Sequence, residues 1–377
     1  MTKKMFRSSV LPLSLCATSV ALGQTGYTPA QAGSADTFTP VLLEPKAVDL
    51  NHISMGFQLG FNLKTSFKHI GKFGAGSNPG STNGISDHFY DDGYNLVDST
   101  GNSHFNGTGF TQGTWNWGYG SLANQVHNNG DVDGTIDMHS TSSAGGSSNG
   151  RAADPQPGFM LTFGRELFRD DKDRWRTGVE WSFGYTDYNI KDSRGVNAKG
   201  TQLTDTYSLF GNTVPTTDNY SQDSGGAPNH IIIGDTPTRS SSSVAVPVSG
   251  TRKFGADLFA FKLGPYFEVP LNKTFSLSLE GGVALVYVYS KFQFNEEVAT
   301  PGGLLNVQGS GVHDGIQVGG YVGAKLSAAL SEKMTLFLGV QFQDAGSYVH
   351  RNHLTGESAV LDLSQSAFFT SGVGYSF

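Results

Sequence analysis

The sequence predicts an all-β fold, a transmembrane, antiparallel, up-and-down β-barrel of eight strands with long extracellular loops. Three observations lead to this prediction: segments in which apolar and polar or small residues alternate, connections that are alternately short and long, and a composition with few charges. Of the 377 residues, 50 are Gly, 12% are aromatic and only 15% are charged. Soluble globular domains carry about 25% charged residues, and disordered chains carry few aromatic residues. The composition therefore disfavours both classes.

The alternation is clearest in residues 53–67, where every odd-numbered position except Thr65 is apolar and every even-numbered position is polar or Gly. A strand with a period of two has one apolar and one polar face, which a helix cannot have. Each alternating segment is therefore a predicted strand. The eight segments are residues 53–67, 158–168, 174–190, 254–270, 274–290, 314–330, 334–344 and 361–377.

The connections between these segments alternate in length. Bacterial outer-membrane barrels have short periplasmic turns and long outer loops, and an even strand count returns both ends of the chain to the periplasm. We therefore expect the long connections to be extracellular. The short connections are residues 169–173, 271–273 and 331–333, and the long ones are roughly residues 68–157, 191–253, 291–313 and 345–360.

Ten strands are the alternative to eight. Within the first long connection, residues 115–119 and 132–138 also alternate between apolar and polar positions. Each stretch has only three or four apolar positions, whereas a spanning strand takes about nine to eleven residues. We therefore favour an extracellular hairpin for these two stretches and keep eight strands in the barrel.

The apolar face of the segments is predicted to face lipid. It consists mainly of aromatic residues and Leu, with aromatic residues at segment ends, where membrane interfaces lie. The opposite face is rich in Gly and poor in charge, although the water-facing side of a soluble barrel would carry many Lys and Glu residues. Residues 283–289 are apolar on both faces, which predicts packing on a loop, a plug or another subunit.

The polar face then lines the lumen of the barrel and carries five charged residues. We predict that these residues form a structural network of ion pairs, because buried charges are normally paired. The alternative is a gate or an ion filter. The five residues are Lys64, Glu180, Lys262, Glu280 and Lys325.

The first 23 residues are predicted to be a signal peptide. A basic start precedes an apolar run from Val10 to Leu22, and the run ends in a small-x-small cleavage site at Gly23. The run is too short for a spanning helix, which needs about 20 apolar residues. We therefore expect export through the Sec pathway, a periplasmic lead-in at residues 24–51 and an outer-membrane barrel at residues 52–377.

The last segment carries a family resemblance. Phe369, Val373, Tyr375 and the terminal Phe377 share one face. This pattern is similar to the C-terminal signal of bacterial outer-membrane proteins that the barrel-assembly machinery reads, and the whole barrel resembles the small OmpA or OmpX type. The resemblance implies the outer membrane of a diderm bacterium, with lipid, lipopolysaccharide and the assembly machinery as partners. The first two loops are longer than in that family.

One segment has the oxygen spacing of a calcium-binding loop. Asn129, Asp131, Asp133 and Asp137 occupy positions 1, 3, 5 and 9 of such a loop, with Gly134 at position 6. Position 12 is a Ser rather than the bidentate Glu, and no helices are predicted on either side. The alternative is a polar hairpin whose Asp and Gly residues make turns. No cofactor other than calcium is suggested by the sequence.

Charge and cysteine content limit the partners further. The net charge of −7 disfavours nucleic acid as a partner. The single cysteine, Cys16, lies in the predicted signal peptide, so a disulfide scaffold and a cysteine-based metal site are not expected.

The predicted function is to anchor extended surface loops in the outer membrane, for envelope structure or contact with an extracellular ligand, without catalysis. The interior of an eight-stranded barrel is normally filled by side chains, so bulk flow is not expected. The alternative is a narrow, porin-like pore, since Gly residues in the lumen leave space. A membrane hydrolase is a third hypothesis, but the candidate pair His52 and Ser54 has no third group to orient it.

Overall fold

The protein is represented by a computed structural model. The chain divides into two units, residues 1–48 and 49–377, and all described residues belong to the second. The predicted signal peptide and the predicted lead-in up to residue 49 therefore lie outside the described residues. In the part of the chain that is described, no helix has both the length and the apolar character that a membrane crossing requires. The described residues are 50–83, 86–97, 104–107, 110–152, 154–222 and 230–377.

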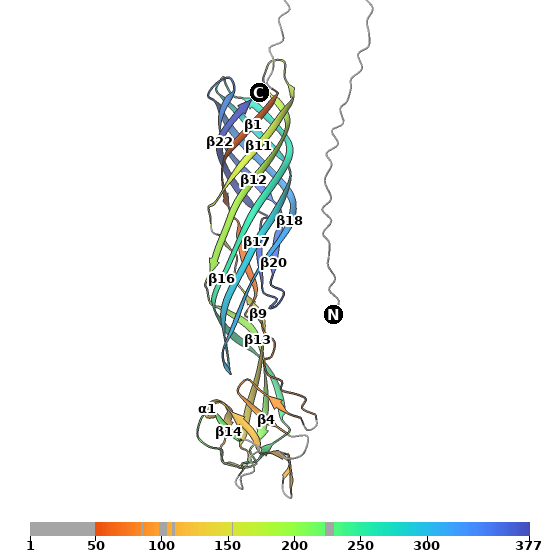
Figure 1. The fold of residues 1–377 in the computed structure, drawn as a ribbon, viewed down its shortest axis with the longest axis vertical. Helices are drawn as coiled ribbons and strands as arrows, with labels where there is room; N and C mark the ends of the chain where they lie inside the picture. Colours follow the sequence, from red (N-terminus) through yellow and green to blue (C-terminus); the bar gives the residue numbers. More distant parts are fainter. Residues whose placement is uncertain (1–49, 84–85, 98–103, 108–109, 153, 223–229) are drawn as a thin grey trace, which may run out of the picture. The chain divides into compact units, whose positions relative to one another are not determined.

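Eight antiparallel strands form a closed ring, in which each strand pairs with the next ring strand along the chain (Figure 1). The ring closes where β1 pairs with β22, with His52 opposite Ser376. Each predicted segment contributes one ring strand, so the prediction of an eight-stranded up-and-down barrel is confirmed. The ring strands are β1 (Asn51–Phe61), β11 (Gln156–Arg169), β12 (Arg176–Asp192), β16 (Thr238–Pro270), β17 (Phe275–Thr300), β18 (Gly303–Ala329), β19 (Met334–Asp344) and β22 (Ser366–Ser376).

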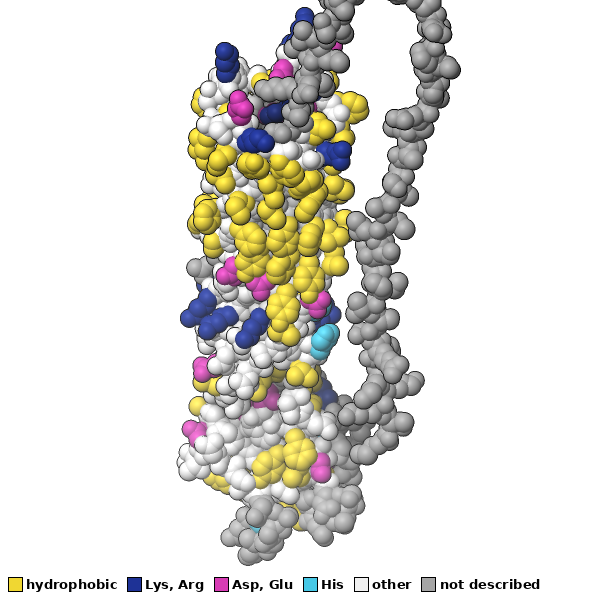
Figure 2. Space-filling view, turned by 45° about the horizontal axis from the view of Figure 1, so that its top comes forward, with side chains coloured by type: hydrophobic (Ala, Val, Ile, Leu, Met, Phe, Trp, Pro, Cys, Tyr) yellow, Lys and Arg dark blue, Asp and Glu magenta, His cyan; other side chains and the backbone are white. Residues whose placement is uncertain are grey.

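The side chains that point out of the ring form an apolar band (Figure 2). On β1, Met55 and Phe57 are 61% and 78% exposed, and Val318 on β18 is 73% exposed. Alternate side chains point inward, where Gln58 is 2% exposed. Large apolar side chains exposed in such numbers are stable in lipid rather than in water. The predicted orientation of the two faces is therefore confirmed for the ring strands within the apolar band.

One end of the barrel, named the turn end, holds the short connections, which cover residues 170–175, 271–274 and 330–333. Backbone hydrogen bonds between Asn51 and Phe377 join the first and last strands at the same end. The opposite end, named the loop end, carries the remaining connections. This separation of short and long connections is the one that the sequence predicts.

Beyond the apolar band the barrel continues as a second set of strands, named the extension. β16, β17 and β18 have 33, 26 and 27 residues and run from the band into the extension. Residues 291–313, predicted as a loop, are therefore a hairpin of β17 and β18 with its turn at residues 301–302. The other strands of the extension are β2 (Lys64–Ile70), β9 (Thr135–Ser147), β13 (Val196–Ser208), β20 (Ser347–Arg351) and β21 (Ser358–Asp362), with β8 (Val126–His127) and β10 (Arg151–Ala152) at their edges.

The first predicted strand, residues 53–67, is broken at Asn62. Asn62 has a positive φ of 61° and separates β1 from β2. Leu63 and Phe67 are fully buried in the extension, whereas the odd-numbered residues of β1 face lipid. The prediction of one lipid-facing side along the whole segment was therefore wrong beyond Phe61, because β2 pairs with loop segments instead of ring strands.

The interior of the extension is an apolar core. Val286 and Val288 on β17 are 2% and 0% exposed and belong to this core, whereas Val283 and Leu285 point to lipid. These positions explain why residues 283–289 are apolar on both faces: one face meets lipid and the other packs on folded loop segments. Further members of the core are Leu63, Phe67, Ile70, Tyr188, Ile190, Phe254, Phe292, Phe294, Val298, Tyr348, Leu361 and Leu363.

Two small sheets and the short helix α1 (Leu122–Gln125) form the distal module, which follows the extension at the loop end (Figure 1). Its core contains Trp117 and Ile136, which are fully buried. Residues 115–119 lie in this module and residues 132–138 lead into β9, so neither stretch joins the ring and the two do not pair as a hairpin. The sheets contain β3 (His88–Phe89), β4 (Gly93–Leu96), β7 (Asn116–Tyr119) and β14 (Tyr220–Gln222), and β5 (His104–Gly107), β6 (Phe110–Thr114) and β15 (Ile233–Gly234).

Candidate functional site

Four of the five charged residues predicted for the lumen lie inside the ring. Glu180 on β12 is 3% exposed and contacts two basic side chains. Lys325 Nζ lies 3.0 Å from Glu180 Oε1, and His52 Nε2 lies 2.8 Å from the same oxygen. The carboxylate is therefore engaged from two sides of the barrel, since β1 and β18 lie on different sides of β12 in the ring.

The other two charged residues are joined through an amide. Gln341 Nε2 donates to Glu280 Oε1 at 3.1 Å, and Gln341 Oε1 accepts a hydrogen bond from Lys262 Nζ. Lys262 Nζ also lies 5.1 Å from the centroid of the Phe368 ring, a cation–π distance. Lys262 is 3% exposed, so this second group occupies the lumen rather than its edge.

Long side chains occupy the space beside two of the Gly residues that face the lumen. A Cβ atom at Gly164 would lie 2.1 Å from His52 Cε1, and a Cβ atom at Gly323 would lie 2.8 Å from Glu280 Oε1. At these positions, Gly makes room for the polar network. The space beside these two Gly residues is therefore occupied by side chains.

The fifth predicted lumen residue, Lys64, lies apart from the other four. It is exposed on β2 in the extension, opposite Asp362 of β21. The break at Asn62 moves all later residues of the predicted strand out of the ring. Lys64 is therefore not a lumen residue. The alternation of apolar and polar residues continues past the break, so the sequence pattern gives no sign of it.

The four residues predicted as calcium ligands lie on or beside the turn between β8 and β9. The Asn129 side chain exchanges two hydrogen bonds with the backbone of Val214, and Asp137 accepts a hydrogen bond at 2.6 Å from a Thr hydroxyl on β13. Asp131 and Asp133 are exposed. Among the described residues, no group of three or more His, Cys, Asp or Glu side chains is arranged to hold a metal ion. The structure thus does not bring the predicted ligands together.

The residues of the predicted assembly signal lie on the outward face of β22 and at its end. Phe369, Val373, Tyr375 and Phe377 are each between 39% and 54% exposed. The Phe377 ring lies 6.4 Å from those of Tyr375 and Phe163. The four side chains therefore form one lipid-facing row that ends at the turn end of the barrel.

A groove of about 690 Å³ lies where the distal module meets the tip of the β17–β18 hairpin. Rings, amides and a carboxylate–imidazole pair line it together, so it offers both stacking surfaces and hydrogen-bonding groups. Its walls include Asp92, Tyr94, Gln125, His139, Gln202 and Tyr220.

Asp92 and His139 form the charged part of the groove. Asp92 Oδ2 lies 2.6 Å from His139 Nδ1, and Asp92 Oδ1 accepts the backbone N–H of His139 at 2.8 Å. The hydrogen bond to Asp92 raises the pKa of His139 above its ordinary value. The raised pKa favours an ion pair in this wall of the groove.

A buried amide fixes the neighbouring wall. Gln125, the last residue of α1, is 1% exposed. Its Oε1 accepts the backbone N–H groups of Gly120 and Ser121 at 2.9 and 2.8 Å. Its Nε2 donates to the carbonyl oxygens of Asp92 and Asp137 at 3.1 and 3.0 Å. One side chain therefore joins α1, the β3–β4 turn and β9.

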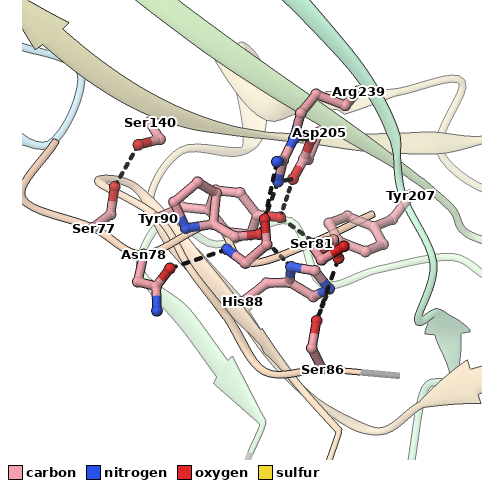
Figure 3. Close-up of polar contacts among 12 residues, drawn as sticks. Ser77, Asn78, Ser81, Ser86, His88, Tyr90, Ser140, Asp205, Tyr207 and Arg239 are labelled. Carbon is pink, nitrogen blue, oxygen red and sulfur yellow. Dashed lines mark hydrogen bonds and ion pairs between the residues drawn. The ribbon is translucent and has the colours of Figure 1, made fainter. Parts of the chain in front are cut away.

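The β3–β4 hairpin that supplies Asp92 and Tyr94 is held by a buried ionic cluster (Figure 3). Tyr90 donates to Asp205 Oδ2 at 2.5 Å, and Arg239 binds both oxygens of Asp205 at 2.7 Å. Asp205 is fully buried, and burial raises the pKa of the Tyr90 hydroxyl so that it stays a donor. The bidentate Arg–carboxylate geometry gives this cluster a defined orientation.

Figure 3 also contains a Ser–His pair. Ser86 Oγ lies 3.3 Å from His88 Nε2, and His88 Nδ1 contacts the carbonyl oxygen of Pro79. A serine nucleophile needs an imidazole that a carboxylate orients and an oxyanion site beside it. Here a peptide carbonyl takes the place of the carboxylate. This arrangement is that of a buried His whose ring nitrogens both have hydrogen-bond partners.

Sequence reasoning did not find the groove. Its residues come from six separated segments, and Asp91-Asp92-Gly93 has the composition of an ordinary turn. The aromatic residues of the first long connection were a partial signal, although Trp117 is fully buried in the core of the module. Only the pairing of β4 with β7, and of β7 with β14, brings Tyr94 and Tyr220 to one place.

The closed ring, the outward apolar band and the separation of turns from loops define a barrel of the bacterial outer-membrane kind. The chain is a transmembrane β-barrel. No protein-family model and no curated protein matches it.

Among solved structures, the chain is similar to Ail, the attachment invasion locus protein of Yersinia pestis, in complex with the heparin analogue sucrose octasulfate. The identity is 11% and the TM-score 0.26, over 87% of this chain and 100% of Ail. It is also similar to the outer-membrane protease OmpT of Escherichia coli, with 11% identity and a TM-score of 0.30 over 87% of this chain and 97% of OmpT. At these values neither likeness bears on function.

Proposed function

We propose that this chain is an outer-membrane protein of a diderm bacterium, exported through the Sec pathway, that displays the distal module outside the cell to contact an extracellular ligand, without catalysis. The observation that carries the proposal is the continuity of the strands. The extension prolongs the ring beyond the apolar band and carries a module with its own buried core.

The orientation follows from the two ends of the barrel. Outer-membrane barrels keep their short turns in the periplasm and their long connections outside. The turn end has connections of four to six residues, at 271–274, 330–333 and 170–175. The distal module therefore faces the outside of the cell.

The filled interior supports display over conduction. Within the membrane, the lumen is occupied by Glu180, Lys262, Gln341 and their partners. Beyond the membrane, the apolar core of the extension fills the barrel. A polar solute would have to pass both the charged side chains of the lumen and the apolar core of the extension, and this combination disfavours conduction.

The groove is the contact surface that we assign to this function. Tyr94 lies across Gly118, because a Cβ atom at Gly118 would be 2.7 Å from Tyr94 Cε1. The ring is half-buried and keeps a face for contact. Aromatic faces beside amides and carboxylates suit polar ligands that have apolar patches.

Cells that display the protein, screened on arrays of glycans and peptides, test this function. We expect binding to at least one class of ligand, and Tyr94→Ala should weaken that binding by about tenfold, the loss typical of one aromatic contact. Gln308→Ala, an exposed change on β18 outside the groove, is the matched control. Equal binding by the wild type and Tyr94→Ala would show that the groove is not the surface that binds the ligand.

Planar bilayers separate display from the alternative of a pore. We expect no stable channels from the purified protein, because both parts of the interior are filled. Reproducible unitary conductance that changes with Glu280→Ala would favour the pore and locate its filter in the lumen.

A further inference from the structure

The side chains that line the groove of the distal module determine which class of ligand it suits. Its walls contain three Tyr rings, of which Tyr94 and Tyr220 are half-buried and Tyr119 is buried. The hydroxyl of Tyr94 lies 2.6 Å from Ser221 Oγ, and the hydroxyl of Tyr220 donates to Gln222 Oε1 at 2.7 Å. Because the protein itself engages these two hydroxyls, what the two residues offer a ligand is ring surface.

Three amide side chains in the groove have no hydrogen-bond partner within the described part of the chain: Asn124, Gln202 and Asn219. Asn124 and Asn219 are exposed, and Gln202 is half-buried. Gln125 differs from them, because both of its polar atoms bind the protein backbone. An amide donates through its NH₂ group and accepts through its oxygen. Each of the three can therefore bind a hydroxyl group, which is also donor and acceptor.

The charges in the groove disfavour an anionic ligand. None of the described residues that line it is Lys or Arg. Asp92 is paired with His139, and Asp91 Oδ2 accepts the backbone N–H of Thr141 at 2.6 Å. Since Asp92 balances any charge on His139, the carboxylate of Asp91 leaves this wall acidic. A sulfated or phosphorylated ligand would be repelled here, so the groove suits an uncharged ligand.

The groove also differs from the sites that hold apolar anchors. Peptides and apolar small molecules are usually held by side chains or rings that enter hydrophobic pockets. Apart from Pro301, the described lining of the groove contains no aliphatic side chain. Gly residues are frequent instead, and a Cβ atom at Gly303 would meet no other atom within 4 Å. The apolar surface of the groove is therefore mainly ring surface, next to open backbone.

Ring surface beside unpaired amides matches the two kinds of surface on a sugar. The faces of a sugar ring carry C–H groups, which pack on aromatic rings, and its edge carries hydroxyl groups, which donate and accept hydrogen bonds. The groove volume of about 690 Å³ lies within the range of small-molecule sites.

We propose that the groove binds an uncharged saccharide, with a sugar ring packed on Tyr94 and its hydroxyl groups bound by Gln202, Asn124 and Asn219. This inference rests on the proposed function, because it names the class of the extracellular ligand. The acidic wall at Asp91 excludes sulfated and other anionic sugars, so charge as well as shape selects the ligand.

The test uses the full mature chain, purified in detergent, and an array that carries neutral oligosaccharides, their sulfated forms and peptides. We expect binding to neutral oligosaccharides, and binding to the sulfated forms that is at least about tenfold weaker. Calorimetric titration with the neutral oligosaccharide that gives the strongest array signal yields a dissociation constant. This constant should be the same at about 50 mM and about 500 mM salt, because salt screens only interactions between charges.

Variants of two groove residues locate the site. Gln202→Ala should weaken binding about fivefold, the loss expected for one neutral hydrogen bond, and it removes no contact that the described structure makes. Gln308→Ala, which removes an exposed amide on β18 outside the groove, is the matched control and should bind like the wild type. Tyr94→Phe keeps the ring and should bind about fivefold more tightly than Tyr94→Ala. Limited proteolysis shows that the distal module of each variant is folded.

Three results would overturn the proposal: binding of peptides alone, binding of sulfated sugars alone with an affinity that falls as salt is added, or binding of neutral sugars that Gln202→Ala and Tyr94→Ala leave unchanged. The first two keep an extracellular ligand and therefore leave the proposed function standing. The third places the saccharide site outside the groove. If no ligand on the array bound at all, the proposed function would fail together with this inference, so the two failures are distinguishable.

Discussion

Glu357 is a buried acid of the extension that lies close to a second buried acid. It is 1% exposed in the connection between β20 and β21, beside Glu296, whose Oε1 lies 2.8 Å from Arg252 Nη1. The N–H of Gly71 donates to the second oxygen of Glu296 at 2.9 Å. Burial, followed by the nearby Glu296, raises the pKa of Glu357 to about 9.

This raised pKa predicts a pH-dependent extension. An unfolded Glu has a pKa of about 4.3, so the folded state binds the proton more tightly and its stability falls as the pH rises from about 4.3 to 9. Glu357→Gln keeps the neutral form at every pH. We expect this variant to flatten the pH dependence and to stabilise the extension by about 2 kcal/mol at pH 9.

Hydrogen exchange of β20 and β21 at pH 5 and pH 9 measures this effect. Glu297→Gln, on the exposed face of β17 next to Glu296, is the control and should leave the wild-type slope unchanged. If hydrogen exchange of β20 and β21 changed between pH 5 and pH 9 as much in Glu357→Gln as in the wild type, the Glu357 carboxyl would be ionised and paired in the folded protein.

The cluster around Asp205 predicts a local loss of stability. Arg239→Ala would leave the fully buried Asp205 with the hydroxyl of Tyr90 but no cation, at a cost of about 3 kcal/mol. We expect protease to cut the β3–β4 hairpin faster while the ring keeps its heat-modifiable shift on a gel.

The matched control for Arg239→Ala is Arg174→Ala. Arg174 contacts Asp170 within a short turn, where water solvates both groups. The control should not change the cleavage pattern. If both variants unfold the ring, the cluster supports the whole barrel rather than the distal module.

At the scale of elements, β22 combines two roles. It closes the ring between β1 and β19, and its outward residues form the predicted assembly signal. Phe377, the residue that follows β22, also exchanges backbone hydrogen bonds with Asn51. Removal of Phe377 therefore takes away both a recognition side chain and a closing contact.

Deletion of Phe377 should reduce the amount of heat-modifiable protein in the outer-membrane fraction by about tenfold, if one aromatic anchor dominates recognition. Phe377→Tyr keeps an aromatic side chain and the backbone contacts at this position, so this variant should assemble normally. Refolding in detergent separates the two roles, because the assembly machinery is absent there. Normal assembly of the deletion in cells would contradict the signal.

At the scale of the whole molecule, the ring carries two further parts at its loop end, the extension and then the distal module. The bridge between Phe73 and Ser143 and the pair Gly200 with Val244 mark the base of the segments that form the distal module. These contacts are the positions at which the module can be removed without cutting a ring strand in the membrane.

Replacement of residues 74–142 and 201–243 by two-residue Asn-Gly turns should leave a barrel that inserts and shows a heat-modifiable shift, because Asn-Gly favours tight hairpins. The shortened chain should lose binding to any extracellular ligand that the wild type binds. Failure to insert would show that the extension and module are needed to fold the ring. Retained ligand binding would place the contact surface elsewhere.

The sequence by itself determined the ring. Alternation with a period of two is a local property of strands, and the outward and inward faces of β17 follow directly from residues such as Leu285 and Ala284. The lengths of the connections determined which end has turns. Lumen residues such as Glu180 and Lys325 were predictable because they continue the same alternation within a ring strand.

Only the tertiary structure decided what the long connections form. A single backbone break at Asn62 turns Leu63 from a lipid-facing residue into a core residue and moves Lys64 out of the lumen. The groove likewise depends on pairings between residues more than a hundred positions apart, such as Tyr119 with Tyr220. Alternation fixes the two faces of a strand, but the partners of each face depend on contacts that are distant in the chain.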